Sequence, residues 1–191
     1  MEGTAVMADP IPDFVEMDNT LPGDYVSRFA AYLERLYDIY MNEVAKGNLR
    51  FKGLGVSCQY RPETHGKHYA FWHMMQEGGM GSTNEDDRTI DFERCRRVRW
   101  IGWTIRNADR NPRIRVFPQA KRHGNQPWAL WVAEVDYLVI LWERNSYYLL
   151  KTAYVIGRKG KRKKLQQEWD AYQKKAGVAA SDDPESSVHS W

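Results

Sequence analysis

The chain has 191 residues, of which 42% are hydrophobic and 28% are charged, so it is long enough for one good core or two very small ones. The formal net charge is only +3, but acids dominate Met1–Leu49 and bases dominate Arg94–Arg122 and Arg158–Lys164. The two cysteines are too few for a disulfide framework or a multi-cysteine zinc site. Eight tryptophans and eleven tyrosines indicate an aromatic core or an aromatic binding face.

Signals for secretion or membrane insertion are not visible in the sequence. The N-terminus is acidic and contains prolines, and no basic segment there precedes an apolar run. The most apolar stretch, Trp128–Trp142, is interrupted by Glu134 and Asp136 and falls short of the roughly 20 apolar residues that a membrane span requires. We therefore expect no membrane partner and a location in a reducing cytoplasm.

The N-terminal part of the chain predicts an arm followed by a helix. Residues 1–22 carry three prolines among scattered acids and predict an extended or mobile acidic arm. Asp24 is a candidate N-cap for a helix from Tyr25 to Lys46, whose apolar residues recur at steps of three and four. The further elements expected in chain order are strands at 51–60 and 67–76, a helix from about 89 to 108, strands at 113–117, 128–133, 137–143 and 147–156, and a helix at 161–175.

This order of elements predicts an α+β fold. The hairpin-like spacing of the strands in the second half favours an antiparallel sheet of four to five strands, with the N-terminal, middle and C-terminal helices packed on it. Residues 23–175 are expected to form a single α+β domain. Residues 176–191 have the composition of a disordered tail.

The middle helix combines arginines with tryptophans on the faces that its apolar stripe leaves free. Arg96–Trp100 and Arg99–Trp103 are i,i+4 pairs, which makes their guanidinium and indole groups neighbours. Arginine suits bidentate phosphate contacts and stacking on bases, so the pattern predicts RNA or another nucleic acid as partner. The alternative is a solvated basic face whose aromatic residues cover the sheet. The candidate nucleic-acid contacts are Arg97, Arg99, Trp100, Trp103, Arg106, Arg115, Lys161 and Arg162.

His73 is the histidine of most interest. It lies among large apolar residues of the second expected strand, where it serves either as a general acid or base, or as a histidine satisfied by a backbone carbonyl. A zinc site shared with His65 and His68 lacks further ligands at a convincing spacing. We therefore expect no metal and no cofactor.

Two hydroxyl side chains mark the last expected strand. Thr152 and Tyr154 point to one face of that strand and Lys151 to the other. Hydroxyls two residues apart on a sheet face can hydrogen-bond a phosphate. The alternative is that the threonine serves strand propensity and the tyrosine packs.

Several segments taken together carry a family resemblance. The segments 71–73, 94–100 and 143–154, closed by 162–165, resemble phage- and prophage-encoded proteins of the phage P1-related type, within the barnase–EndoU–colicin–RelE-like nuclease group. The resemblance covers about residues 50–170. It implies a small α+β domain, metal-independent RNA cleavage and a role as a toxin or anti-host effector. The active groups that it implies by position are His73, Arg94, Arg96, Thr152 and Tyr154.

The expected chemistry is cleavage by the neighbouring ribose 2′-hydroxyl, which requires no metal. His73 is the general base or acid, an arginine stabilises the phosphorane, and exposed bases stack on Trp100 and Trp103. The alternative is a catalytically inactive phage protein that inhibits a host nucleic-acid defence system by binding. A third hypothesis is that the chain is a structural protein of a virion. A host protein or an immunity protein is a further candidate partner.

Overall fold

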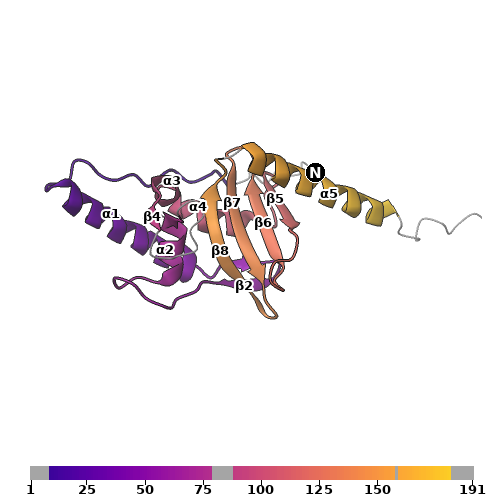
Figure 1. Ribbon diagram of the computed structural model, residues 1–191, viewed down its shortest axis with the longest axis horizontal. Helices are drawn as coiled ribbons and strands as arrows, with labels where there is room; N and C mark the ends of the chain where they lie inside the picture. The colour runs from indigo at the N-terminus through magenta and orange to yellow at the C-terminus, as the bar shows by residue number, and fades with distance from the viewer. Residues whose placement is uncertain (1–8, 79–87, 158, 182–191) are drawn as a thin grey trace, which may run out of the picture.

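The computed structural model describes residues 9–78, 88–157 and 159–181, which form a single α+β domain (Figure 1). Its helices are α1 (Tyr25–Tyr40) with the π-helical extension η1 (Met41–Ala45), α2 (Tyr69–Met75), α3 (Phe92–Cys95), α4 (Val98–Asn107) and α5 (Lys159–Ser181). The described strands are β1 (Arg50–Phe51), β2 (Leu54–Ser57), β3 (Gln76–Glu77), β4 (Thr89–Ile90), β5 (Ile114–Pro118), β6 (Pro127–Val132), β7 (Tyr137–Glu143) and β8 (Tyr147–Val155).

The sheet confirms the predicted α+β class and extends it. In the described parts of the chain, six strands pair in the order β1-β2-β8-β7-β6-β5, and β5 to β8 form the predicted antiparallel meander. The addition is a hairpin, β1–β2, whose second strand runs parallel to the start of β8. Lys52 and Gly53 form its two-residue turn with positive φ angles of 47° and 81°, a conformation that glycine adopts without strain.

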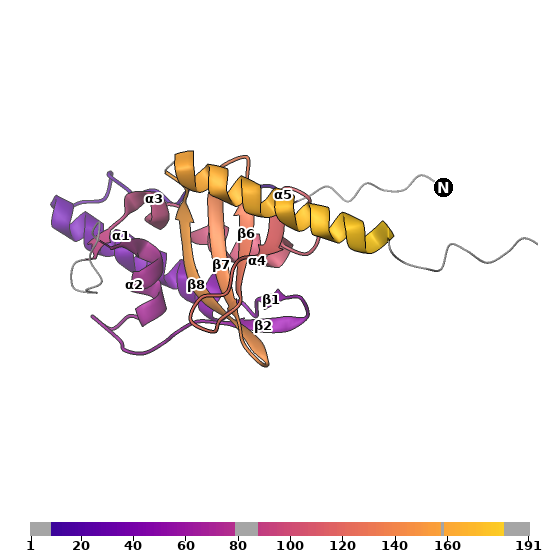
Figure 2. The ribbon, with the colours of Figure 1, turned by 45° about the vertical axis from the view of Figure 1, so that its right-hand side comes forward.

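Helices cover both faces of the sheet and create two apolar clusters. The larger cluster lies between the sheet and α1, α2 and α4, and contains Tyr40, Ile101 and Val139. The smaller one lies on the opposite face, where Trp169 of α5 packs on Phe117 of β5. Figure 2 shows α5 crossing in front of the strands while α4 lies behind them. The sheet therefore separates side chains that pack against α1, α2 and α4 from those that face α5.

The strand predicted at 67–76 is wrong, because this segment contains α2. Its buried residues are Ala70, Phe71, Met74 and Met75, which recur at helical spacing and face the large cluster. A short apolar run is compatible with a strand or a buried helix, and only the packing partner decides between them. His73 consequently lies on a helix rather than on a strand.

The middle helix is divided into α3 and α4. The N-cap is Asp91 rather than Thr89, which lies in β4. The predicted buried stripe is confirmed in Val98, Ile101 and neighbouring apolar residues, whereas Phe92 is exposed. At Gly102, a Cβ atom would lie 2.6 Å from the carbonyl oxygen of Glu43, so only glycine allows α4 to approach η1 this closely.

The segment before α1 packs against the domain, contrary to the predicted mobile arm. Val15 is buried, and its backbone N–H donates to the Arg96 carbonyl at 2.8 Å. The Trp100 indole N–H donates to the Pro12 carbonyl at 2.7 Å, and Phe14 stacks on the same indole. These contacts brace the junction of α3 and α4. Residues 1–8 of the expected arm lie outside the described residues.

The terminal helices otherwise follow the expected pattern. Asp24 caps α1 by accepting a hydrogen bond from the Ser27 backbone N–H at 2.8 Å. Helix α5 continues to Ser181, so the segment 176–181 is helical instead of disordered, and 182–191 lies outside the described residues. Within the described ranges, we find no helix with the length and hydropathy of a membrane span.

Candidate active site

A groove of about 760 Å³ opens on the α5 face of the sheet, bounded by α2, α3, β7, β8 and the first turns of α5. We call it the groove. Five residues singled out in the sequence line it together: His73, Arg94, Thr152, Tyr154 and Lys161. They come from four elements, and the tertiary structure brings the helical ones to the hydroxyl-bearing face of β8.

Strand geometry places the hydroxyls in the groove. Thr152 pairs with Ile140 and Tyr154 with Leu138, and all four side chains line the same hollow. The alternation predicted for β8 holds for these residues but not for Lys151, which also lines the groove. The cause is a β-bulge between Ile140 and Leu141 that shifts the register at this point.

Arg94 lies at the junction between α3 and the groove. Its Nε is 3.2 Å from Asp91 Oδ2, and its Nη1 donates to the His73 carbonyl at 3.5 Å. Its side chain is only 12% exposed, and this burial lowers the pKa of the guanidinium, against the opposing effect of Asp91. An arginine keeps its charge at neutral pH. The contacts with Asp91 and the His73 carbonyl therefore hold a cation in one orientation at the groove wall.

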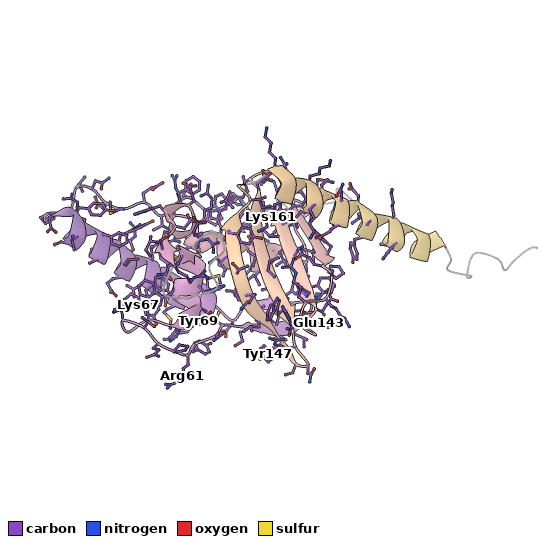
Figure 3. All side chains as sticks on the ribbon, viewed as in Figure 1. Arg61, Lys67, Tyr69, Glu143, Tyr147 and Lys161 are labelled. Atoms are coloured by element: carbon purple, nitrogen blue, oxygen red, sulfur yellow. The ribbon has the colours of Figure 1, made fainter. Side chains whose placement is uncertain are left out.

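Tyr154 lies between two cations. The Arg94 guanidinium carbon is 5.4 Å from the ring centre, and the Lys161 Nζ is 4.0 Å from it. Lys161 extends from the N-terminal end of α5 beside β8 (Figure 3). Burial raises the pKa of the Tyr154 phenol above its ordinary value, opposed by the charge of Arg94. The phenol is therefore protonated at neutral pH and can donate to a phosphate oxygen.

His73 joins this group from α2. Its ring is partly buried and stacks on Tyr69, with the ring centres 5.6 Å apart. His65 and His68 lie outside the groove, near Trp72 and Glu63 respectively. Among the described residues, no three His, Cys, Asp or Glu side chains are grouped to hold a metal ion.

The lining of the groove carries an excess of positive charge. Of its described residues, Glu168 alone is acidic, and that carboxylate already accepts a hydrogen bond from Gln119 at 2.7 Å. The basic lining residues are His73, Arg88, Arg94, Arg122, Lys151, Lys161 and Lys164. Such a hollow concentrates anions. No pattern in the sequence pointed to Arg88 or Arg122, because loops bring both to the groove.

The other predicted arginines do not line the groove, which corrects their assignment as one shared binding site. Arg96 forms an ion pair with Glu16, Arg97 with Glu93, and Arg99 with Glu43. The arginines placed outside the groove are Arg96, Arg97, Arg99, Arg106, Arg115 and Arg162. Arg96 therefore also leaves the set of candidate catalytic groups.

Three of these arginines are held elsewhere in the domain. Arg106 donates to the Glu43 carbonyl at 3.1 Å, and Arg115 donates to Gln166 between the sheet and α5 at 2.6 Å. Arg162 lies 3.0 Å from Asp136. Each of the three therefore has a partner within the chain, and for Arg162 that partner is a carboxylate.

Trp100 and Trp103 are buried, so the expectation that they stack on bases is wrong. Each is 5% exposed. Trp100 lies between Phe14 and Tyr137, with ring centres 5.3 Å away on both sides. Helical spacing identifies neighbours on a helix, but it does not show which face the N-terminal segment covers.

Comparisons with known proteins gave no match to a family model, to a curated protein or to a solved structure. The motif resemblance described for the sequence therefore has no support from a homologue or structural neighbour. The functional conclusion rests on the groove.

Proposed function

We propose that the chain binds RNA in the groove and cleaves it by a metal-independent reaction. The observation that carries this proposal is that His73, Arg94, Thr152, Tyr154 and Lys161 line one cationic hollow. An acid–base group, hydroxyl donors and fixed cations are the components that transfer of a phosphoryl group to a neighbouring hydroxyl requires.

In the proposed reaction, the ribose 2′-oxygen attacks the adjacent phosphorus and the bond to the 5′-oxygen breaks. His73 takes the proton of the 2′-hydroxyl, and Tyr154 supplies the proton that the departing 5′-oxygen needs. The products are a 2′,3′-cyclic phosphate and a free 5′-hydroxyl, and solvent returns the proton from His73 to the Tyr154 phenolate. Burial raises the pKa of the Tyr154 phenol, which makes it a weaker acid, and the charge of Arg94 next to the ring opposes this effect.

Arg94 and Lys161 stabilise the negative charge that develops on the phosphorane. Both lie beside the Tyr154 ring, at 5.4 and 4.0 Å from its centre. Preorganised cations of this kind stabilise a transition state more than the ground state when charge accumulates there. Thr152, two residues away on the same strand face, positions the phosphate by a hydrogen bond.

The direct test is incubation with single-stranded RNA in a chelator. Wild type should produce cyclic-phosphate ends, and His73→Ala should cleave about a hundred- to ten-thousandfold more slowly. Tyr154→Phe should bind the RNA but cleave it more slowly. The matched DNA strand should bind without being cut, because it lacks the 2′-hydroxyl. Equal cleavage by wild type and His73→Ala would remove His73 from the mechanism.

A second candidate is binding without turnover, which the ion pair of Arg94 with Asp91 favours. That carboxylate already neutralises part of the charge that catalysis would use. In this form the chain inhibits a host nucleic-acid system by contact alone. Retention of RNA by wild type with no product at any enzyme concentration would support this candidate over cleavage.

The biological setting belongs to the proposal as well. A phage or prophage origin, a toxin or anti-host role in the bacterial cytoplasm, and a host or immunity protein as further partner rest on the motif resemblance alone. Expression in a bacterial host should arrest growth with wild type and not with His73→Ala. Equal arrest by both proteins would separate toxicity from cleavage.

A further inference from the structure

Trp142 of β7 supplies an aromatic surface that the proposed reaction does not use. It is partly buried and lines the groove on the same strand face as Leu138 and Ile140. Of the described lining residues, Trp142 is the only tryptophan. Its side chain lies at the groove, whereas Trp100 and Trp103, which the sequence favoured, are buried.

Two cations lie over this ring, so a base that stacks on the indole has to displace one of them. Lys151 Nζ lies 4.8 Å from the ring centre, and the Arg144 guanidinium carbon lies 5.3 Å from it. A π surface next to two cations matches one nucleotide unit, because a base has a flat face and the phosphates beside it are anions.

The sheet register separates this aromatic end of the groove from the proposed site of cleavage. Leu138 pairs with Tyr154, and Trp142 follows Leu138 by four residues on the same strand. At a rise of about 3.3 Å per residue, the two positions are roughly 13 Å apart. One mononucleotide cannot fill both ends, whereas a short strand can.

The charge of the lining indicates which way such a strand runs. A second hollow adjoins the groove at Arg94, Tyr154 and Lys161, and its wall carries Glu77, Asp91 and Glu93. Asp91 and Glu93 are ion-paired with Arg94 and Arg97. The basic residues of that lining, Arg94 and Lys161, are both shared with the groove, so the described part of the second hollow offers a phosphate chain no further cation. A polyanion that reaches Arg94 is therefore directed along the groove towards Trp142.

We infer that Trp142 is a base-stacking subsite and that the ligand of the groove is an unpaired nucleic-acid strand. The inference deepens the proposed function and rests on it for the class of ligand. A base in a duplex has both faces covered by its neighbours, so only an unpaired base can stack on the indole. Lys151, which lines the groove, then contacts a phosphate next to that base.

The test compares two probes that the protein cannot cleave by the proposed reaction. One is a single-stranded deoxyoligonucleotide, and the other is an abasic strand of the same length and charge. Wild type should bind the base-bearing strand about five- to a hundredfold more tightly. Trp142→Ala should abolish this preference while its affinity for the abasic strand changes less than twofold. Annealing the deoxyoligonucleotide to its complement should also abolish the preference.

Conservative variants control for folding. Trp142→Phe should keep most of the preference, and Trp128→Phe, on the neighbouring strand but outside the groove lining, should keep all of it. Equal weakening of both probes by Trp142→Ala, or an unchanged preference, would overturn the subsite. RNA cleavage by wild type without a base preference defeats the subsite alone. A base preference without RNA cleavage defeats the cleavage reaction alone and leaves the subsite supported.

Discussion

Arg94 and Arg99 are five residues apart, and the domain gives them different environments. Arg94 lines the groove next to Tyr154, and Arg99 pairs with Glu43 at 2.9 Å outside that lining. The chemistry of an arginine does not differ between the two positions. What differs is the surroundings of the guanidinium, a groove lined by other cations for Arg94 and a carboxylate partner elsewhere for Arg99, and these are decided by neighbours that are distant in the sequence.

This contrast predicts different effects for two alanine variants. Arg94→Ala should weaken binding of an uncleavable single strand, because one cation in the groove is lost. The slope of log affinity against log salt concentration should become shallower by about 0.7. Arg99→Ala should change neither affinity nor slope by a measurable amount. A titration at several salt concentrations measures both, and equal losses would place the phosphate path outside the groove.

At the scale of elements, the short helix α3 depends on its N-cap residue, Asp91. Asp91 Oδ1 accepts hydrogen bonds from the backbone N–H groups of Glu93 and Arg94, at 2.9 and 3.3 Å, while Oδ2 pairs with the Arg94 guanidinium. One carboxylate therefore caps the helix and also orients the arginine. A helix of four residues has little other local support, because short helices are marginal without tertiary contacts.

The two roles of Asp91 can be separated by substitution. Asp91→Ala removes the cap and should lower the free energy of unfolding by about 1 kcal/mol. Asp91→Asn keeps a cap of nearly equal quality and should retain most of the stability, although the ion pair is lost. Urea denaturation of the two variants measures the difference. Equal destabilisation would show that the ion pair with Arg94, and not the cap, stabilises α3.

At the scale of the whole molecule, the sheet separates a face that is covered by the large apolar cluster from a face that also carries the charged groove. The large cluster, on the face covered by α1, α2 and α4, encloses Tyr40 and Tyr137. The groove on the α5 face keeps charged groups near solvent. Burial raises the pKa of both phenols far above the ordinary value of 10.0. The fold therefore depends on these tyrosines remaining protonated.

Stability should consequently fall in alkaline solution. Above pH 10 the unfolded chain releases the protons of these tyrosines while the folded chain retains them. The contribution of Tyr40 and Tyr137 to the free energy of unfolding is complete below pH 10. It is lost as the pH rises towards the pKa values that these tyrosines have in the folded chain. Each such group should lower the free energy of unfolding by about 1.4 kcal/mol per pH unit above 10. Denaturation between pH 8 and 11 measures this, and Tyr137→Phe should reduce the slope. An equal slope in that variant would contradict the assignment.

Local patterns predicted the parts of the fold in which neighbours along the chain decide the structure. The apolar run Tyr137–Trp142 predicted the strand at 137–143, which is β7 with the bounds that it has, and alternation put Thr152 and Tyr154 on one face. The failure at α2 is of another kind. Its apolar run around His73 fits either period, and only packing between α1 and β8 decides for a helix.

The sequence by itself determined the α+β class, the antiparallel meander and the residue types available for phosphate chemistry, because these follow from periodicity, caps and side-chain chemistry. Only the tertiary structure decided which of these residues meet. It brings Lys161 to Tyr154 and covers Trp100 with the segment before α1. Contacts between residues so far apart along the chain arise from packing of whole elements, which leaves no local pattern.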